Sequence, residues 1–375
     1  MRAMRSMARA VSLVAVTAVA VAVPDWSGRA APAQAPPAVI LVTLDGARVE
    51  EIFGGLDVAV LKSTIGADAK VEANAAFQRF WAPTPEARRS RLLPFFWDTL
   101  MRVAGSIAGN RALGSDVHVT NRLWFSYPGY SELLVGAAHD DVIKSNDATQ
   151  NPYPTALEFL RQKLGASPTG VGLFSAWSVF RAIGESRPGT ITINAGYQRY
   201  DHPDPAIRAL GDRQFETPTP WDSVRHDLYT FQFAMAHLAT YRPRVLYLAL
   251  GETDDWAHDG RYDRVLDAYA RSDRYLKELW AWVESQPDYR GRTSLLITTD
   301  HGRGRTPGDW REHGAKFPGA GDTWMAFVSP GLSTRGEWRA HAPITASQAA
   351  ATLITWMGYD WREFNPAAAP PIAVR

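Results

Sequence analysis

The sequence of 375 residues contains no cysteine, and this absence excludes several features at once. The chain has no disulfide, no thiolate metal ligand and no cysteine for a lipid anchor. Any metal ligands are therefore nitrogen or oxygen atoms. Stability must come from packing and from any bound metal.

An excess of charge of either sign is also missing, since 40 Lys and Arg residues stand against 39 Asp and Glu residues. The chain therefore has no excess of positive charge that would predict binding to a nucleic acid. The sequence also lacks an internal repeat, a low-complexity linker and a Walker-type glycine loop. Partners must therefore be inferred from the site, where we expect a small-molecule anionic ester.

A long hydrophobic run is absent too. Ala10 to Val23 is apolar, but at about fourteen residues it is short for a membrane-spanning helix. Arginines precede the run and small residues follow it, which is typical of a secretory signal peptide. We predict that residues 1–35 are a signal peptide, that the protein is periplasmic or secreted, and that no stable membrane insertion remains after cleavage. An uncleaved signal anchor is the alternative, and the cleaved bond stays open.

Three apolar runs each end at a carboxylate or an imidazole. The runs and the residues that follow them are Val39 to Leu44 with Asp45, Val245 to Leu250 with Asp254 and His258, and Ser294 to Thr299 with Asp300 and His301. Such runs are typical of strands buried on both faces of a parallel sheet, whose functional groups lie at the carboxyl ends. We therefore predict a metal site at one sheet edge. Helix caps and turns at three independent places are the alternative.

The spacing of these residues favours metal binding. Asp254 and His258 are four residues apart, which places two side chains on one face of a helical turn, toward one ion. His313 lies within loop reach of the same edge. Asp255 is the competing ligand, although an ion pair with Arg261 or Arg264 would explain it equally well.

Charge accounting favours two divalent ions. Crowded carboxylates without metal would force some of them to protonate. Two dications balance Asp45, Asp254, Asp300 and an ionised Ser126. Nitrogen and oxygen ligands favour Zn²⁺, with Mn²⁺ as the alternative. Such a pair suits an in-line displacement at an anionic ester.

A hydroxyl nucleophile is expected in the segment around Pro128 and Gly129. We predict that these two residues break regular structure and that a helix begins at Ser131, which caps it. That leaves Ser126 free for chemistry. A hydroxyl in front of a helix N-terminus suits a nucleophile and an anionic substrate.

Strands and helices alternate along the whole chain, which predicts a doubly wound, mostly parallel α/β sheet with helices on both faces. We expect a single domain over residues 36–375, with residues 50–115 partly an inserted cap or surface excursion that includes a helix over Leu92 to Ala108. Asp201 to Pro205 could imitate a metal cluster, but its prolines predict a surface turn.

The chain from Val39 to its closing helix resembles the alkaline phosphatase superfamily, most closely the nucleotide pyrophosphatase/phosphodiesterase-like branch. The motifs that carry the resemblance are Asp45-Gly46, Ser126-Tyr127-Pro128, Asp254-x-x-x-His258, Thr299-Asp300-His301-Gly302 and His313-Gly314. The resemblance implies that one metal is held by Asp254, His258 and His313, and the second by Asp45, Asp300 and His301. It also implies that Ser126 is the covalent phosphoryl acceptor beside the second metal.

Three positions decide how far the resemblance extends. Ser126 stands where the phosphodiesterase branch usually has Thr, so the preference for a monoester or a diester stays open. The family's phosphoryl-binding Asn maps to Asn146, with Asn151 as its rival. Tyr130 occupies the place of a sulfatase Arg, so we do not expect formylglycine.

We therefore expect an exported two-metal hydrolase of phosphate esters that acts through a phosphoseryl intermediate. The alternatives are a sulfate or phosphonate ester hydrolase on the same fold and a non-catalytic periplasmic protein that binds an anion. The leaving group, the metal identity and the oligomeric state stay open.

Overall fold

The structure, a computed structural model, describes residues 37–374, which belong to one compact unit, Pro36–Arg375. The predicted signal peptide therefore lies outside the described residues. Among residues 37–374, no helix combines the length and the apolar character needed to cross a bilayer.

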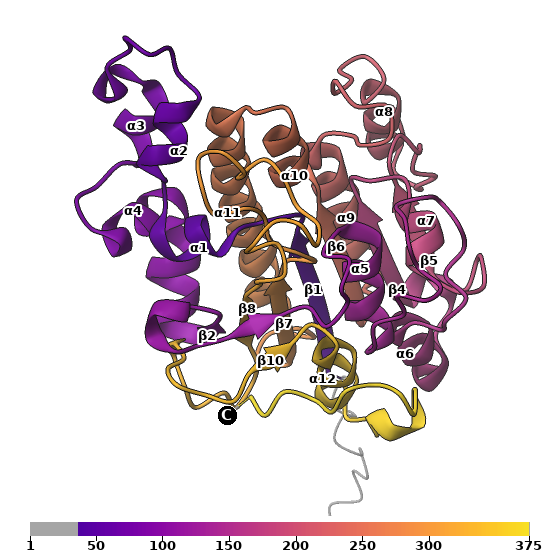
Figure 1. Cartoon of the computed structure of the whole chain (residues 1–375). Helices are drawn as coiled ribbons and strands as arrows, with labels where there is room; N and C mark the ends of the chain where they lie inside the picture. The colour runs from indigo at the N-terminus through magenta and orange to yellow at the C-terminus, as the bar shows by residue number, and fades with distance from the viewer. Residues whose placement is uncertain (1–36, 375) are drawn as a thin grey trace, which may run out of the picture. The chain divides into compact units, whose positions relative to one another are not determined.

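An eight-stranded sheet forms the centre of the fold, in the order β5-β4-β6-β1-β7-β8-β2-β9 (Figure 1). Its strands are β1 (Ala38–Leu44), β2 (Gly105–Ala108), β4 (Val171–Ser175), β5 (Thr192–Ala195), β6 (Val245–Leu250), β7 (Thr293–Thr298), β8 (Met325–Val328) and β9 (Gly336–Glu337). Of these described strands, only β8 runs against its neighbours, β7 and β2. The mostly parallel α/β sheet predicted from the sequence is confirmed. A separate parallel pair joins β3 (Val117–His118) to β10 (Ile344–Thr345).

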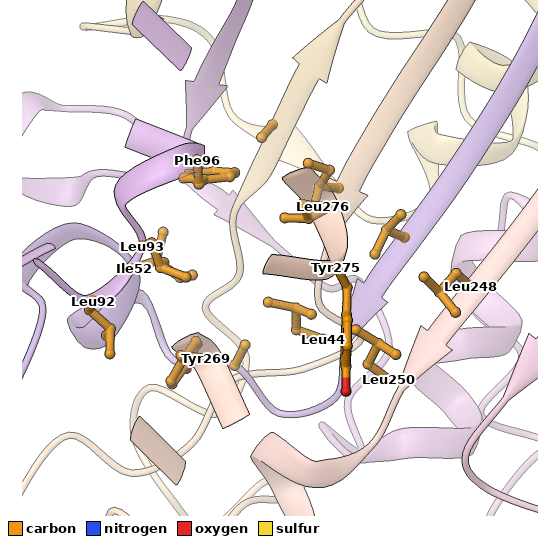
Figure 2. Packing of buried hydrophobic residues seen from close by; sticks show 14 of the residues in the cluster. Leu44, Ile52, Leu92, Leu93, Phe96, Leu248, Leu250, Tyr269, Tyr275 and Leu276 are labelled. Carbon is orange, nitrogen blue, oxygen red and sulfur yellow. The ribbon is translucent and has the colours of Figure 1, made fainter. Parts of the chain in front are cut away.

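Helices cover both faces of the sheet because successive side chains of each buried strand point to opposite sides. In β1, Ile40 and Val42 belong to one hydrophobic cluster, whereas Val39 and Leu41 belong to the other. Figure 2 shows the first cluster, where Leu248 of β6 lies among residues of the helices that cover that face.

The first face is covered by α1 (Val49–Gly54), α2 (Val58–Ser63), α3 (Ala75–Phe80), α4 (Pro85–Leu92), a π-helix (Phe96–Ala104), α9 (Asp227–Tyr241) and α11 (Tyr262–Ser285). The second face is covered by α5 (Ser126–Val135), α6 (Ala156–Leu164), α7 (Phe180–Ile183) and α12 (Gln348–Trp356). The remaining helices are α8 (Pro205–Arg213), α10 (Glu252–His258) and short 3₁₀ turns at Val71–Ala73, Arg111–Leu113, Pro168–Gly170 and Trp361–Glu363.

The expected helix over Leu92 to Ala108 is wrong at its C-terminal end. The helical part stops at Ala104, and Gly105–Ala108 forms β2, which pairs with β8. The pairing supplies main-chain hydrogen bonds that outweigh a local helical pattern. Part of the segment predicted as a surface excursion therefore belongs to the central sheet.

Asp201 to Asp204 form a loop in front of α8, which begins at Pro205, but this loop is not fully exposed. His202 is buried, and its Nε2 lies 3.0 Å from Thr240 Oγ1. Its Nδ1 accepts a hydrogen bond from the Asp204 amide at 3.1 Å. These contacts make His202 a structural residue of the loop.

Candidate active site and metal centre

Three neighbouring strands deliver the predicted ligands to one edge of the sheet. β1 lies between β6 and β7, with Leu44 opposite Leu250 and Thr43 opposite Thr298. The chain then continues into Asp45, into α10 and into Asp300. The Thr253 hydroxyl donates to the Asp45 carbonyl at 2.6 Å, which ties the start of α10 to the end of β1.

The Asp45 group consists of Asp45, Asp300 and His301, three residues that could hold one metal ion. His301 Nε2 lies 3.6 Å from Asp45 Oδ1 and 3.4 Å from Asp300 Oδ2. All three side chains are buried. The His301 Nδ1 lies 2.8 Å from the Gly302 carbonyl, which fixes the proton on Nδ1 and leaves the Nε2 lone pair for a ligand bond.

The Asp254 group consists of Asp254, His301 and His313. His258 lies beside it, with its Nε2 at 3.1 Å from Asp254 Oδ2 and at 3.0 Å from His313 Nε2. The grouping differs from the partition implied by the resemblance, because His301 belongs to both groups and His258 stands at an exposed rim. The structure brings every predicted ligand to this one place.

Asp255 does not join either group among the described residues. The predicted alternative was an ion pair of Asp255 with Arg261 or Arg264. These arginines pair with other carboxylates, Arg261 with Asp263 and Arg264 with Asp267. Burial raises the pKa of Asp255 well above its usual range, with the Asp45 charge as a further cause.

The chemistry of these side chains fits divalent cations. Asp45 Oδ1, Asp300 Oδ2 and His313 Nδ1 are buried and have no hydrogen-bond partner. Burial raises the pKa of Asp45 to about 8, with the Asp300 charge as the second cause, and burial also raises the pKa of Asp300 to about 7. Burial lowers the pKa of His301 and of His313, so both imidazoles are neutral and able to ligate. Unpaired carboxylate oxygens beside neutral imidazoles are the ligands that a divalent cation needs.

Ser126 is the first residue of α5, and its Oγ lies 3.3 Å from His301 Nε2. The prediction of a helix start at Ser131 is wrong, because Pro128 and Gly129 lie in the first turn of α5. A proline there gives up an amide that has no partner inside the helix. Ser131 does not cap the helix, since it is buried in it and accepts from Asn151 Nδ2 at 3.3 Å.

The two candidate asparagines occupy different places. Asn146 is exposed, and its Oδ1 accepts a hydrogen bond from the Tyr127 amide at 2.9 Å, next to Ser126. Asn151 is fully buried and also bonds the Ile183 carbonyl at 3.3 Å. Of the two, only Asn146 lies at the N-terminus of α5.

Gly129 and Tyr130 place α5 against the loops that follow β1 and β7, which carry Asp45 and Asp300. A Cβ atom on Gly129 would lie 2.3 Å from the carbonyl oxygen of Asp300, so only glycine allows this approach. Burial raises the pKa of Asp45, and the buried Tyr130 hydroxyl is one of the groups that act against this rise. From the sequence, Tyr130 was noted only because it stands where sulfatases have an arginine.

Sequence reasoning missed two residues that hold the Asp254 side of the site. Arg303 is buried and donates to the Asp254 carboxylate and, at 3.1 Å, to the Asp254 carbonyl. Asp227 accepts from the Gly251 amide at 2.8 Å and from the Glu252 amide at 3.2 Å, which caps the N-terminus of α10. The only sequence signal for either residue was the position of Arg303 directly after the Asp300-His301-Gly302 motif.

Solved structures share this fold at low sequence identity. The lipoteichoic acid synthase LtaP from Listeria monocytogenes is 10% identical, with a TM-score of 0.53 over 89% of this chain and 74% of that one. A mutant of alkaline phosphatase PafA is 11% identical, with a TM-score of 0.51 over 90% of this chain and 98% of that one. The structure of Ps i-CgsB is 13% identical, with a TM-score of 0.51 over 90% of this chain and 75% of that one.

No curated protein sequence matches the chain. A family model described as type I phosphodiesterase / nucleotide pyrophosphatase matches residues 65–348, which is most of the chain and includes every candidate site residue except Asp45. The fold of alkaline phosphatase PafA and the order of the motifs agree with this match. The chain therefore belongs to the type I phosphodiesterase / nucleotide pyrophosphatase family.

Proposed function

We propose that the protein is an exported hydrolase of phosphate esters that uses two divalent metal ions and a phosphoseryl intermediate at Ser126. One observation carries the proposal: the Ser126 hydroxyl lies 3.3 Å from His301, beside buried carboxylate oxygens that have no partner. A protein that only binds an anion does not need a hydroxyl at this position. The family match supports the same reaction class.

The chain offers ligands for both ions. Asp45, Asp300 and His301 would hold one, with Ser126 beside it, and Asp254, His313 and His258 would hold the other. When bound, such ions supply positive charge that lowers the pKa of a hydroxyl and neutralises a phosphoryl group. We propose Zn²⁺, because the ligands are nitrogen and oxygen atoms, with Mn²⁺ as the alternative.

Ser126 and its helix bind and orient the substrate. The N-terminus of α5 presents the Ser126 amide and the positive end of the helix dipole to a phosphoryl group, since the Tyr127 amide bonds Asn146 and the Gly129 amide bonds the Phe125 carbonyl. The Asn146 Oδ1 is engaged by the Tyr127 amide, so its Nδ2 protons remain to donate to a phosphoryl oxygen.

The reaction then has two steps. In the first, Ser126 loses its proton to solvent, its Oγ forms a bond to phosphorus, and the bond to the leaving oxygen breaks; the leaving group takes a proton from water. In the second, water attacks the phosphoserine, which releases the phosphate product and restores the hydroxyl. The short distance between α5 and the Asp300 loop keeps Ser126 in the geometry that both steps need.

The substrate class and the nucleophile are tested together. The mature protein loaded with zinc is assayed against bis-p-nitrophenyl phosphate, p-nitrophenyl phosphate and p-nitrophenyl sulfate in parallel. We expect turnover of a phosphate ester, and Ser126→Ala should abolish it while metal content stays unchanged. Turnover of the sulfate alone would favour the sulfatase alternative, and retained activity in Ser126→Ala would refute the phosphoseryl intermediate.

Export is tested separately, on the full chain. Expression in a bacterial host with fractionation of periplasm and cytoplasm should give a periplasmic protein whose N-terminus begins near residues 31–35. Accumulation of the uncleaved chain in the membrane fraction would favour the signal anchor.

A further inference from the structure

Arg303 places a permanent positive charge inside the candidate metal centre. It follows the Asp300-His301-Gly302 motif and is almost fully buried. Its Nη2 donates to the Asp254 carboxylate Oδ1 and to the Asp254 carbonyl, and its Nη1 donates to the Arg311 carbonyl. The guanidinium therefore connects the loop after β7 to helix α10.

The surrounding backbone holds this pair in place. Gly46 has a φ of +56°, and a Cβ atom on it would lie 2.5 Å from Asp254 Oδ1 and 2.9 Å from Arg303 Nε. The pair thus fills the space that glycine leaves free at the end of β1. A buried ion pair of this kind does not open readily, because opening leaves both charges without water or a partner.

The two ligand groups differ in their number of carboxylates, and the Nη2 hydrogen bonds of Arg303 go to Asp254. The Asp45 group contains two carboxylates, and one oxygen of each is buried without a partner. The Asp254 group contains a single carboxylate, and Arg303 already neutralises one of its oxygens. Only Asp254 Oδ2 remains for an ion, at 3.1 Å from His258 Nε2.

The histidines also make the Asp45 group a better ligand set than the Asp254 group. The His301 Nε2 can ligate one ion only, and it lies nearer to Asp45 Oδ1 and Asp300 Oδ2 than to Asp254 Oδ1, which is 3.9 Å away. The Asp254 group is then left with His313 and with His258, whose side chain is 44% exposed. An exposed ligand costs more entropy to order than a buried one.

We propose that Arg303 makes the two metal sites unequal, so that the Asp45 group binds its ion first and the Asp254 group binds at a metal concentration at least about tenfold higher. The inference rests on the proposed two-metal function and adds that the centre fills in steps. At low metal concentration the protein therefore carries one ion, next to Ser126, and gains its second only when metal is abundant.

The test measures metal binding without any substrate. Chelator-treated protein is titrated with Zn²⁺ by calorimetry and against a chromophoric chelator. We expect two steps that differ at least about tenfold in affinity. Asp254→Asn should remove the weaker step, and Asp300→Asn the tighter one. A single step of two equal ions, or loss of the tighter step in Asp254→Asn, would overturn the proposal.

Variants at position 303 test the cause. Arg303→Gln removes the charge and frees Asp254 Oδ1, so the two affinities should move closer together. Arg303→Lys keeps the charge, and the two steps should remain separate. Arg305→Gln is the matched control, because Arg305 pairs with Asp322 and contacts no candidate ligand. If Arg303→Gln folds and the gap stays as in the wild type, Arg303 is not the cause.

Failure of this inference can be told from failure of the proposed function. Zinc binding in two unequal steps without hydrolysis of any ester would leave the inference standing and reject the function. Hydrolysis by a centre that binds both ions equally would do the reverse. Should Arg303→Gln not fold, the Asp254→Asn and Asp300→Asn titrations still decide which group is tighter.

Discussion

Gly129→Ala tests whether the contact between α5 and the Asp300 loop sets the catalytic geometry. The added Cβ atom would lie 2.3 Å from the Asp300 carbonyl oxygen and 2.9 Å from its carbonyl carbon. Both atoms belong to backbone, so no side chain can turn aside to make room. The helix that carries Ser126 must therefore move away from the loop that carries Asp300 and His301.

The size of the effect follows from this geometry. Ordinary Cβ contacts begin near 3.4 Å, so the two backbones must separate by roughly 1 Å. A displacement of 1 Å in a catalytic group costs about 100-fold in rate. Overpacking of a core contact costs about 1 to 3 kcal/mol of stability, which a domain with a large core tolerates. We expect a folded variant with kcat/KM reduced about 100-fold.

The assay compares kcat/KM for the phosphate ester that the wild type hydrolyses, together with the free energy of unfolding. Gly54→Ala is the matched control, because a Cβ atom there would contact nothing within 4 Å. It should keep wild-type kinetics and change stability by no more than about 1 kcal/mol. Wild-type kcat/KM in folded Gly129→Ala would refute the argument that this contact positions Ser126.

The remaining predictions concern single side chains. Tyr130→Phe removes the hydroxyl that helps to lower the pKa of Asp45 and should weaken Zn²⁺ binding about tenfold, measured by chelator competition; unchanged affinity would contradict it. Asn146→Ala should lower kcat/KM about 100-fold with little change in stability. Asn151→Ala should instead lower the free energy of unfolding by about 1 to 3 kcal/mol. The opposite pattern in the two variants would make Asn151 the site residue. Burial raises the pKa of Asp273 from 3.8 to about 6, so its contribution to stability is full below pH 4 and is lost as the pH rises through 6. The unfolding free energy of the wild type relative to Asp273→Asn should therefore fall by roughly 2 to 3 kcal/mol between pH 4 and pH 7, and a flat difference in chemical denaturation would contradict this.

The sequence predicts the central strands and their ends well because burial on both faces leaves a strong local signal. Val245 to Leu250 is apolar throughout and matches β6 residue for residue. Local patterns alone are therefore enough to predict that the groups following β1, β6 and β7 share one sheet edge. The short strand β2 had no such signal, since Gly105–Ala108 continues a helical pattern and becomes a strand only through its pairing with β8.

The start of α5 shows a second limit of local reasoning. Pro128 and Gly129 read as a break when only propensity is considered. In the fold, the proline occupies a first-turn position where its missing amide costs nothing, and the glycine is required by the Asp300 carbonyl. The same two residues that suggested a loop are the ones that allow Ser126 to begin the helix beside the ligands.

Arg303 could not be assigned from the sequence, because its role depends on three loops that are far apart in the chain. An arginine after Gly302 reads as a surface residue, and its burial follows only from the meeting of Asp254, the end of β1 and the loop after β7. Gly46 completes this arrangement, since any side chain there would collide with both members of the pair. The glycine of the Asp45-Gly46 motif is thus explained by the Arg303 guanidinium, which lies far from it in the sequence. Charge accounting that omits Arg303 therefore underestimates the positive charge of the loaded centre by one unit.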